Sequence, residues 1–266
     1  MTAPPPRADA EWLAVAGLRL DVDDEVATIT LDRPERRNAQ TPATWHGLGR
    51  IARELPAHTR IVVVRGAGPT FSSGLDVRML SPEGAPGEDS LLDLAGRPDH
   101  EVESFVSAAQ DGFAWLRRPD IVSIASVHGH AIGAGFQLAL ACDLRVLAAD
   151  ARLAMRETTL GLVPDLGGTK PLVDIVGLAR ALEICLTGRE VDAKEAAGLG
   201  LAELVVPSAE LEGAVRDLVA ALVAAPADAV ADTKRLLLGA AGRSYEEQLA
   251  AERHAQLERL RALFRS

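Results

Sequence analysis

Cysteine is scarce in this sequence, and its two occurrences form no recognisable site. Among 266 residues only Cys142 and Cys185 carry a thiol, both in apolar stretches and without the spacing of metal ligands. A disulfide framework or a zinc site needs more cysteines at characteristic spacings. We therefore expect two reduced, buried thiols in a cytoplasmic protein, and no metal site.

Long apolar runs and an excess of positive charge are also missing. No stretch approaches the ~18 uncharged apolar residues of a membrane-spanning helix, and residues 1–10 lack the apolar core of a signal peptide. The formal net charge of −10 argues against nonspecific nucleic-acid binding, which needs a clustered basic surface. We therefore expect a globular protein without membrane or nucleic-acid partners, in which local arginines and backbone dipoles would meet any anionic ligand.

The chain is organised around residues 128–143, where a glycine-rich turn lies between two apolar segments. Residues 121–127 have the composition of a buried strand, and residues 136–141 that of a buried helix. A turn that opens a helix leaves several backbone N–H groups without intrahelical acceptors. With the helix dipole they suit an anion, or an oxygen that becomes negative during a reaction. The same pattern also serves as a packing device, so both interpretations stay open here.

Periodicity elsewhere predicts an α/β core followed by helices. Alternation predicts a hairpin over residues 18–22 and 26–31, and Thr41-Pro42 is typical of a helix start. Residues 81–98 are polar and rich in glycine and proline, which favours a lid or pocket wall over scaffold. The other expected elements are strands at 61–64, 144–147, 152–155 and 202–206, and helices at 101–116, 178–186, 192–199 and from about 209 to the end.

Four segments together carry a specific resemblance. They are residues 33–39 (RPERRNA), 68–76 (GPTFSSGLD), 127–135 (VHGHAIGAG) with Cys142-Asp143, and 160–169 (LGLVPDLGGT). Each is weak alone, but in this order and at this spacing the chain resembles the crotonase (enoyl-CoA hydratase/isomerase) superfamily over residues 15–260. The resemblance implies an α/β fold, a crotonase-like spiral of ββα units with a helical C-terminal trimerisation region.

The resemblance also implies an organisation and a ligand. We expect a disordered tail over residues 1–14, an α/β core over 15–207 and a helical region over 208–266 that mediates a homotrimer or a hexamer of paired trimers. Members of the superfamily bind acyl-CoA thioesters. Coenzyme A is therefore expected as part of the substrate, and no prosthetic group is expected.

Two backbone amides are implied to polarise the thioester carbonyl. They belong to Leu75, just after Gly74, and to Ala134 at the start of the central helix. A proton next to a thioester leaves readily only if the enolate oxygen is stabilised as its charge develops, and each such donor contributes about 3–4 kcal/mol. Ala134 stands where many relatives carry glycine, but the N–H is retained.

The acid/base residues follow the resemblance less closely. The two glutamates that deliver water in hydratases fall on Gln137 and Glu157, and Gln137 cannot exchange a proton in this pH range. One carboxylate suffices to move a proton between two carbons, so Glu157 is the expected base of a double-bond isomerase. Asp165 is a second catalytic candidate, although its position before Gly167 and a helical run also suits a helix N-cap.

Three functions stay open on this basis. The first is enoyl-CoA double-bond isomerisation through Glu157, and the second is hydration of a 2-enoyl-CoA by Glu157 with Asp165 or Gln137. The third is a non-catalytic acyl-CoA-binding protein that kept the pocket.

The resemblance further implies where the CoA moiety lies. Arg36, Arg37 and Arg78 are candidates to neutralise its phosphates, although a solvated run of charge is the competing interpretation. The remaining residues expected to line the CoA site are Ala39, Ser72, Gly74, Leu75, Asp76, Val77 and Ala134.

Overall fold

The computed structural model describes residues 10–264. A six-stranded sheet in the order β1-β2-β3-β4-β6-β9 forms its centre. The hairpin of β1 and β2 is antiparallel, as expected, and every later pair in this sheet is parallel. The strands are β1 (Leu18–Asp23), β2 (Val26–Leu31), β3 (Ile61–Gly66), β4 (Val122–Val127), β6 (Leu144–Ala148) and β9 (Leu204–Val206).

A second, three-stranded sheet has the order β5-β7-β8, formed by β5 (His130–Ile132), β7 (Arg152–Ala154) and β8 (Val191–Asp192). The chain therefore leaves β4, adds the short strand β5 to this second sheet, and only then enters helix α5 (Ala134–Ala141). The strand expected at 121–127 is thus followed by another strand before the helix begins. This strand–strand–helix order is the unit that the sequence predicted.

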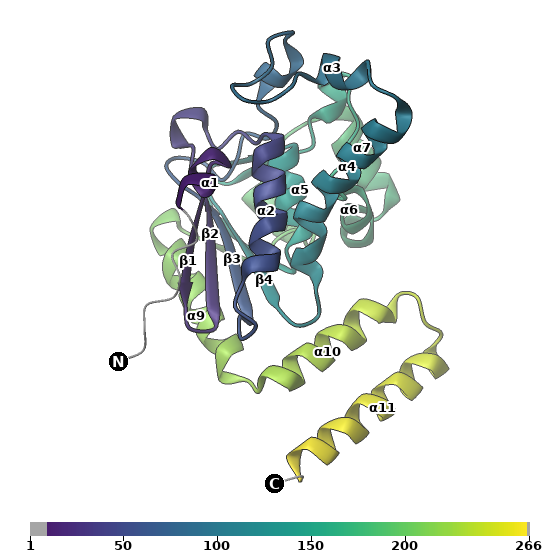
Figure 1. Cartoon of the computed structure of the whole chain (residues 1–266). Coiled ribbons are helices and arrows are strands. Elements are labelled where there is room, and N and C mark those ends of the chain that lie inside the picture. Colours follow the sequence, from purple (N-terminus) through teal and green to yellow (C-terminus); the bar gives the residue numbers. More distant parts are fainter. Residues whose placement is uncertain (1–9, 265–266) are drawn as a thin grey trace.

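Helices cover both faces of the central sheet (Figure 1). Successive valines of β3 alternate between two separate apolar clusters, because side chains of a strand point to opposite faces. Val62 and Val64 belong to the large core that includes helices α2 (Pro42–Glu54), α4 (Asp99–Ala114) and α5. Val63 belongs to a second core closed by helix α9 (Leu211–Ala224). A parallel sheet buried on both faces explains the continuous apolar run of β3.

Helices α2 and α4 approach each other closely at a glycine. A Cβ atom on Gly112 of α4 would lie 2.3 Å from the carbonyl oxygen of Trp45 in α2. Pro42 occupies the first turn of α2, as the Thr41-Pro42 pair predicted. The close approach sets Trp45 and Phe105 edge to face, with ring centroids 6.5 Å apart. This pair forms part of the site described below.

The remaining helices complete the core and extend from it. The expected C-terminal helical region is present, but α9 packs on the sheet, whereas α10 (Ala227–Ala240) and α11 (Tyr245–Leu263) project away from it (Figure 1). Helix α11 buries none of its residues within this chain. The other helices are α3 (Leu91–Ala95), α6 (Thr169–Val176), α7 (Leu178–Thr187) and α8 (Ala193–Gly198).

The last residues assigned to the expected N-terminal tail form a helix. Residues 1–9 lie outside the described residues, but Ala10–Val15 forms helix α1 and buries Leu13 against the core. Apolar burial therefore orders a segment that the prediction assigned to the disordered tail over residues 1–14. Within residues 10–264, no helix has both the length and the apolar character needed to span a membrane.

Candidate active site

An apolar cavity of about 450 Å³ opens at the N-terminus of helix α5. Helices α2 and α4 form one side, and a 3-10 helix over Glu157–Leu160 with the segment that follows it forms the other. Leu91 and Leu94 lie in its wall, so part of the segment over residues 81–98 is a pocket wall, one of its two expected roles. Other apolar lining residues include Trp45, Val102, Phe105, Val106, Ile132, Leu160, Leu162, Val163 and Leu166.

The hydrogen bonds on either side of Leu75 fix the direction of its backbone N–H. Gln40 N donates a hydrogen bond to Gly74 O at 2.7 Å, and Asp76 N donates one to Gln40 O at 2.8 Å. The residues on both sides of Leu75 are therefore hydrogen-bonded to Gln40. Because the C=O and N–H of one trans peptide point in opposite directions, and Gly74 O faces Gln40, the N–H of Leu75 points away from Gln40. Within the described chain this N–H has no acceptor, and Leu75 lines the cavity.

Ala134 is the first residue of α5, so its N–H has no intrahelical acceptor. A Cβ atom on Gly74 would lie 2.5 Å from Ile132 O and 3.5 Å from Ala134 N, which sets the loop of Leu75 against the start of the helix. Gly74 and Gly133 have positive φ angles of 87° and 51°, conformations that glycine adopts readily. The structure thus brings the two expected amides to one cavity, at the positive end of a helix dipole.

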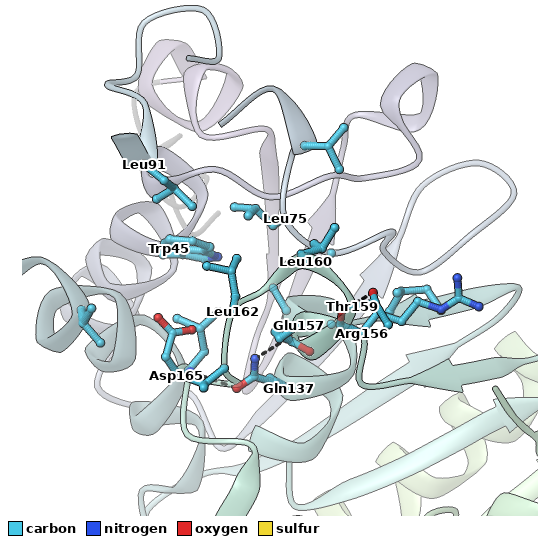
Figure 2. A pocket seen from close by; sticks show the side chains of 18 of the residues that line it. Trp45, Leu75, Leu91, Gln137, Arg156, Glu157, Thr159, Leu160, Leu162 and Asp165 are labelled. Atoms are coloured by element: carbon cyan, nitrogen blue, oxygen red, sulfur yellow. Dashed lines mark hydrogen bonds between the residues drawn. The ribbon is translucent and has the colours of Figure 1, made fainter. Parts of the chain in front are cut away.

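Glu157 is buried at the inner end of this cavity. Its Oε1 accepts a hydrogen bond from Gln137 Nε2 at 2.6 Å, drawn as a dashed line in Figure 2. Its Oε2 is buried and makes no hydrogen bond to any described residue. A Cβ atom on Gly133 would lie 3.1 Å from Oε1, so the carboxylate lies beside the residue that precedes Ala134.

The environment of Glu157 raises its pKa. Burial is the largest cause, the charge of Asp165 adds to it, and hydrogen bonds from the backbone and from Gln137 oppose it. A carboxyl whose pKa moves toward neutrality is suited to general acid–base work, because it exchanges protons near physiological pH.

Gln137 connects helix α5 to two other parts of the site. Its Oε1 accepts hydrogen bonds from Leu166 N at 2.9 Å and Gly168 N at 3.3 Å, while its Nε2 donates to Glu157. The side chain is buried and lines the cavity floor. The position where the family resemblance implies a glutamate in hydratases is therefore filled by an amide that bonds to Glu157, Leu166 and Gly168.

Asp165 does not cap a helix, and the capping interpretation is wrong. Helix α6 begins at Thr169, its N-cap residue is Gly168, and no side chain caps it. Asp165 instead lines the cavity, and its backbone carbonyl accepts a hydrogen bond from Gln110 Nε2 of α4 at 2.7 Å. The surrounding walls raise the pKa of its carboxyl by desolvation. Figure 2 shows it on the opposite side of Gln137 from Glu157.

The residues expected to line the CoA site divide into three groups. Gly74, Leu75, Val77 and Ala134 line the cavity, and Val77 is exposed at its mouth. The second group, Arg36 and Arg37, is exposed on the segment between β2 and α2.

The third group is buried and packs beneath the loop that carries Leu75. Its members are Ser72, Asp76 and Ala39. Ser72 Oγ accepts a hydrogen bond from Gly74 N at 3.2 Å and has no exposed surface. The carboxylate of Asp76 accepts hydrogen bonds from Arg78 and Arg33, which lower its pKa to about 2. Direct contact of the Ser72 side chain with a ligand is therefore not possible in this structure, and Arg78 is tied to Asp76.

Trp45 and Phe105 are lining residues that the sequence did not reveal. The indole is fixed because Trp45 Nε1 donates to Gln40 Oε1 at 3.0 Å. Both residues lie on the apolar faces of amphipathic helices, and such a pattern predicts burial without indicating that the partner is a cavity. Among residues 10–264, no cluster of His, Cys, Asp or Glu is arranged to hold a metal ion.

Strand–strand–helix order, two backbone amides without acceptors in residues 10–264, and a buried carboxylate around one apolar cavity define a protein of the crotonase fold. The chain belongs to the enoyl-CoA hydratase/isomerase family, whose model matches residues 21–263.

Individual relatives agree with this assignment. A candidate enoyl-CoA hydratase of Thermobifida fusca YX, crystallised with CoA, is 53% identical with a TM-score of 0.91, covering 100% of this chain and 99% of its own. A structure with acetoacetyl-CoA, also from that organism, is 55% identical with a TM-score of 0.90, covering 94% of this chain and 97% of its own. A candidate enoyl-CoA hydratase of Rhodobacter capsulatus is 33% identical over 91% of this chain and 88% of its own. The peroxisomal Δ(3,5)-Δ(2,4)-dienoyl-CoA isomerase of Arabidopsis thaliana is 30% identical over 87% of this chain and 84% of its own.

Proposed function

We propose that this protein moves the double bond of an enoyl-CoA, with Glu157 as the acid/base residue. The observation that carries the proposal is the unequal use of the two positions that hold glutamates in hydratases. Glu157 has an oxygen that no described residue hydrogen-bonds, whereas Gln137 has its carbonyl oxygen bound to two backbone amides. A mechanism with one proton-carrying side chain fits this site better than one that needs two.

The reaction follows from this arrangement. The thioester oxygen lies between the N–H groups of Leu75 and Ala134, which stabilise the charge that develops on it. Glu157 removes a proton from carbon 2 of a 3-enoyl-CoA, and the electron pair delocalises over the thioester oxygen and carbon 4. Glu157 then returns the proton to carbon 4, which leaves a double bond between carbons 2 and 3. No other reactant is consumed.

The CoA moiety is proposed to lie at the mouth of the cavity, near Val77. Relatives crystallised with CoA and acetoacetyl-CoA support this ligand class. Arg36 and Arg37 are exposed there and suit the phosphates on an otherwise acidic protein. Replacing both by alanine should weaken CoA binding and reduce its salt dependence, whereas Arg53→Ala, at an exposed arginine of α2, should change neither.

Hydration is the second candidate, because Asp165 lines the same cavity and its carboxyl pKa is also raised. In that case Glu157 and Asp165 would share the proton transfers of water addition. Incubating the protein separately with a 3-enoyl-CoA and a 2-enoyl-CoA distinguishes the two. Isomerisation without hydration supports the proposal, hydration supports the second candidate, and tight binding without any turnover indicates an acyl-CoA-binding protein.

The base is tested by Glu157→Gln. We expect turnover to fall by about 10²–10⁴-fold, the contribution of a general acid–base group, while CoA affinity stays within a few-fold of the wild type. Glu212→Gln provides a matched control, because Glu212 is an exposed carboxylate of α9 that pairs with Arg65, and neither residue lines the cavity. A fully active Glu157→Gln enzyme would refute the assignment of the base.

The protein is further proposed to assemble as a homotrimer or a hexamer of paired trimers. Helix α11 buries no residue within its own chain, yet it exposes Leu257, Leu260 and Leu263. An exposed apolar stripe on a projecting helix is typical of an interface. Light scattering coupled to size exclusion tests this directly, and a monomer at micromolar concentration would contradict it.

A further inference from the structure

We propose that Gln137 is a positioning residue whose amide fixes the Glu157 carboxylate so that Oε2 is the oxygen that carries the transferred proton. This inference rests on the proposed function only in that Glu157 handles a substrate proton. It gives a role to a side chain that does not itself exchange protons.

The orientation of the Gln137 amide is set by its neighbours. Leu166 N and Gly168 N can only donate, so the atom that faces them must be the carbonyl oxygen. The amide nitrogen is thereby turned toward Glu157. Gly168 also packs against the side chain, because a Cβ atom there would lie 2.7 Å from Gln137 Cγ. The amide therefore has little freedom to swing away.

This orientation makes the two oxygens of Glu157 unequal. Oε1 accepts the hydrogen bond from Gln137 Nε2 at 2.6 Å, and a proton placed on Oε1 would face another N–H. Oε2 is buried without a hydrogen-bond partner among the described residues. Negative charge is costly on a buried oxygen that receives no hydrogen bond, and a proton taken from the substrate removes that charge. The structure thus assigns the proton to Oε2.

Two substitutions separate this role from a structural one. Gln137→Glu keeps an acceptor for Leu166 N and Gly168 N, but it replaces the donor to Glu157 by a second carboxylate. Two carboxyls at this separation do not both ionise readily, so one proton stays shared between them and the upper of the pair's two pKa values is raised. Gln137→Met fills a similar volume, removes the donor, and also removes the acceptor for the loop.

The readout is exchange of the carbon 2 protons of a saturated acyl-CoA in heavy water, followed by mass spectrometry across a pH series. This exchange needs the two amides and Glu157, but no double-bond migration. The exchange rate falls at low pH as Glu157 becomes protonated, and we call this part of the profile the acid limb. We expect both variants to move the acid limb to higher pH, so that the exchange rate at a pH below the limb falls by about tenfold or more. At a pH where the pair keeps its protons, only Gln137→Met should also lower the melting temperature, because it alone releases the loop. Gln137→Glu should lower the melting temperature only as the pair ionises at higher pH.

An unshifted acid limb in Gln137→Glu, in a protein that melts like the wild type, would overturn the inference. Exchange with a shifted limb but without isomerisation of a 3-enoyl-CoA would refute the proposed function and leave this inference standing. Undiminished exchange in Glu157→Gln, or no exchange by the wild type, would refute both.

Discussion

Gly74 lies against Ile132 so closely that a Cβ atom on Gly74 would be 2.5 Å from the carbonyl oxygen of Ile132. Gly74→Ala must therefore push the loop of Leu75 away from the start of α5. Displacing one of two oxyanion donors is expected to lower kcat by about 10²–10³-fold. Steady-state kinetics on the preferred enoyl-CoA checks this.

The control for that substitution is Gly87→Ala. Gly87 has a positive φ of 80°, like Gly74, but nothing lies within 4 Å of the position that its Cβ atom would take. It therefore carries the backbone strain of alanine at positive φ without a clash at the site. Equal loss of activity in both variants would show that strain, and not displacement of Leu75, explains the defect.

Asp165→Asn tests whether a second carboxylate takes part in the reaction. If Glu157 acts alone, kcat for isomerisation should fall by less than about tenfold, well below the 10²–10⁴-fold of a lost acid–base group. The acid limb of the rate should move to lower pH, because the charge of Asp165 raises the pKa of Glu157. Asp174→Asn, at an exposed carboxylate of α6, is the matched control. A loss of several hundredfold would instead favour the two-carboxylate hydratase.

Local signals in the sequence predicted the parts of this site that depend on backbone pattern. The run of β4 and the glycines after it marked the start of α5, because a tight turn with positive φ at Gly133 needs glycine. The hairpin of β1 and β2 followed from two-residue alternation. Leu75 and Ala134 came from the family resemblance, and the structure places both on one cavity.

Features that depend on how distant segments meet were not predictable. Asp165 precedes a helical run, but the loop is held by Gln137 and Gln110, so the helix starts later than its sequence suggests. Ser72 lies in an extended loop, and pattern alone does not tell which face of such a segment is buried. Trp45 faces a cavity only because α2 and α4 pack closely at Gly112.

Glu157 should also lower the stability of the folded protein at neutral pH. Its pKa is raised on folding, so the folded state binds the proton more tightly and the free energy of unfolding falls as pH rises from the ordinary value of 4.5. Glu157→Gln removes this effect. We expect the variant to melt at a higher temperature than the wild type at pH 8, and the difference to shrink as pH approaches 4.

Melting curves of both proteins at matched pH values measure this difference, with Glu212→Gln as the comparison for an exposed carboxylate. A Glu157→Gln protein less stable than the wild type at pH 8 would show that the hydrogen bond from Gln137 outweighs the desolvation of the carboxylate. The inactive variant would then be no aid to crystallising a substrate complex.

Lys234 attaches the projecting C-terminal helices to the core. Its buried Nζ donates to Asp143 Oδ2 at 2.6 Å and to the carbonyl oxygens of Arg118 and Ile121 at 2.7 Å each. Lys234→Met leaves Asp143 without its cation, and breaking a buried pair in this way is expected to destabilise by about 3–5 kcal/mol. We expect a melting temperature lower by several degrees and faster proteolysis between α9 and α10, whereas Lys194→Met, at an exposed lysine of α8, should change neither. If Lys234→Met melted and resisted protease like the wild type, packing of α10 rather than this ion pair would hold the C-terminal helices in place.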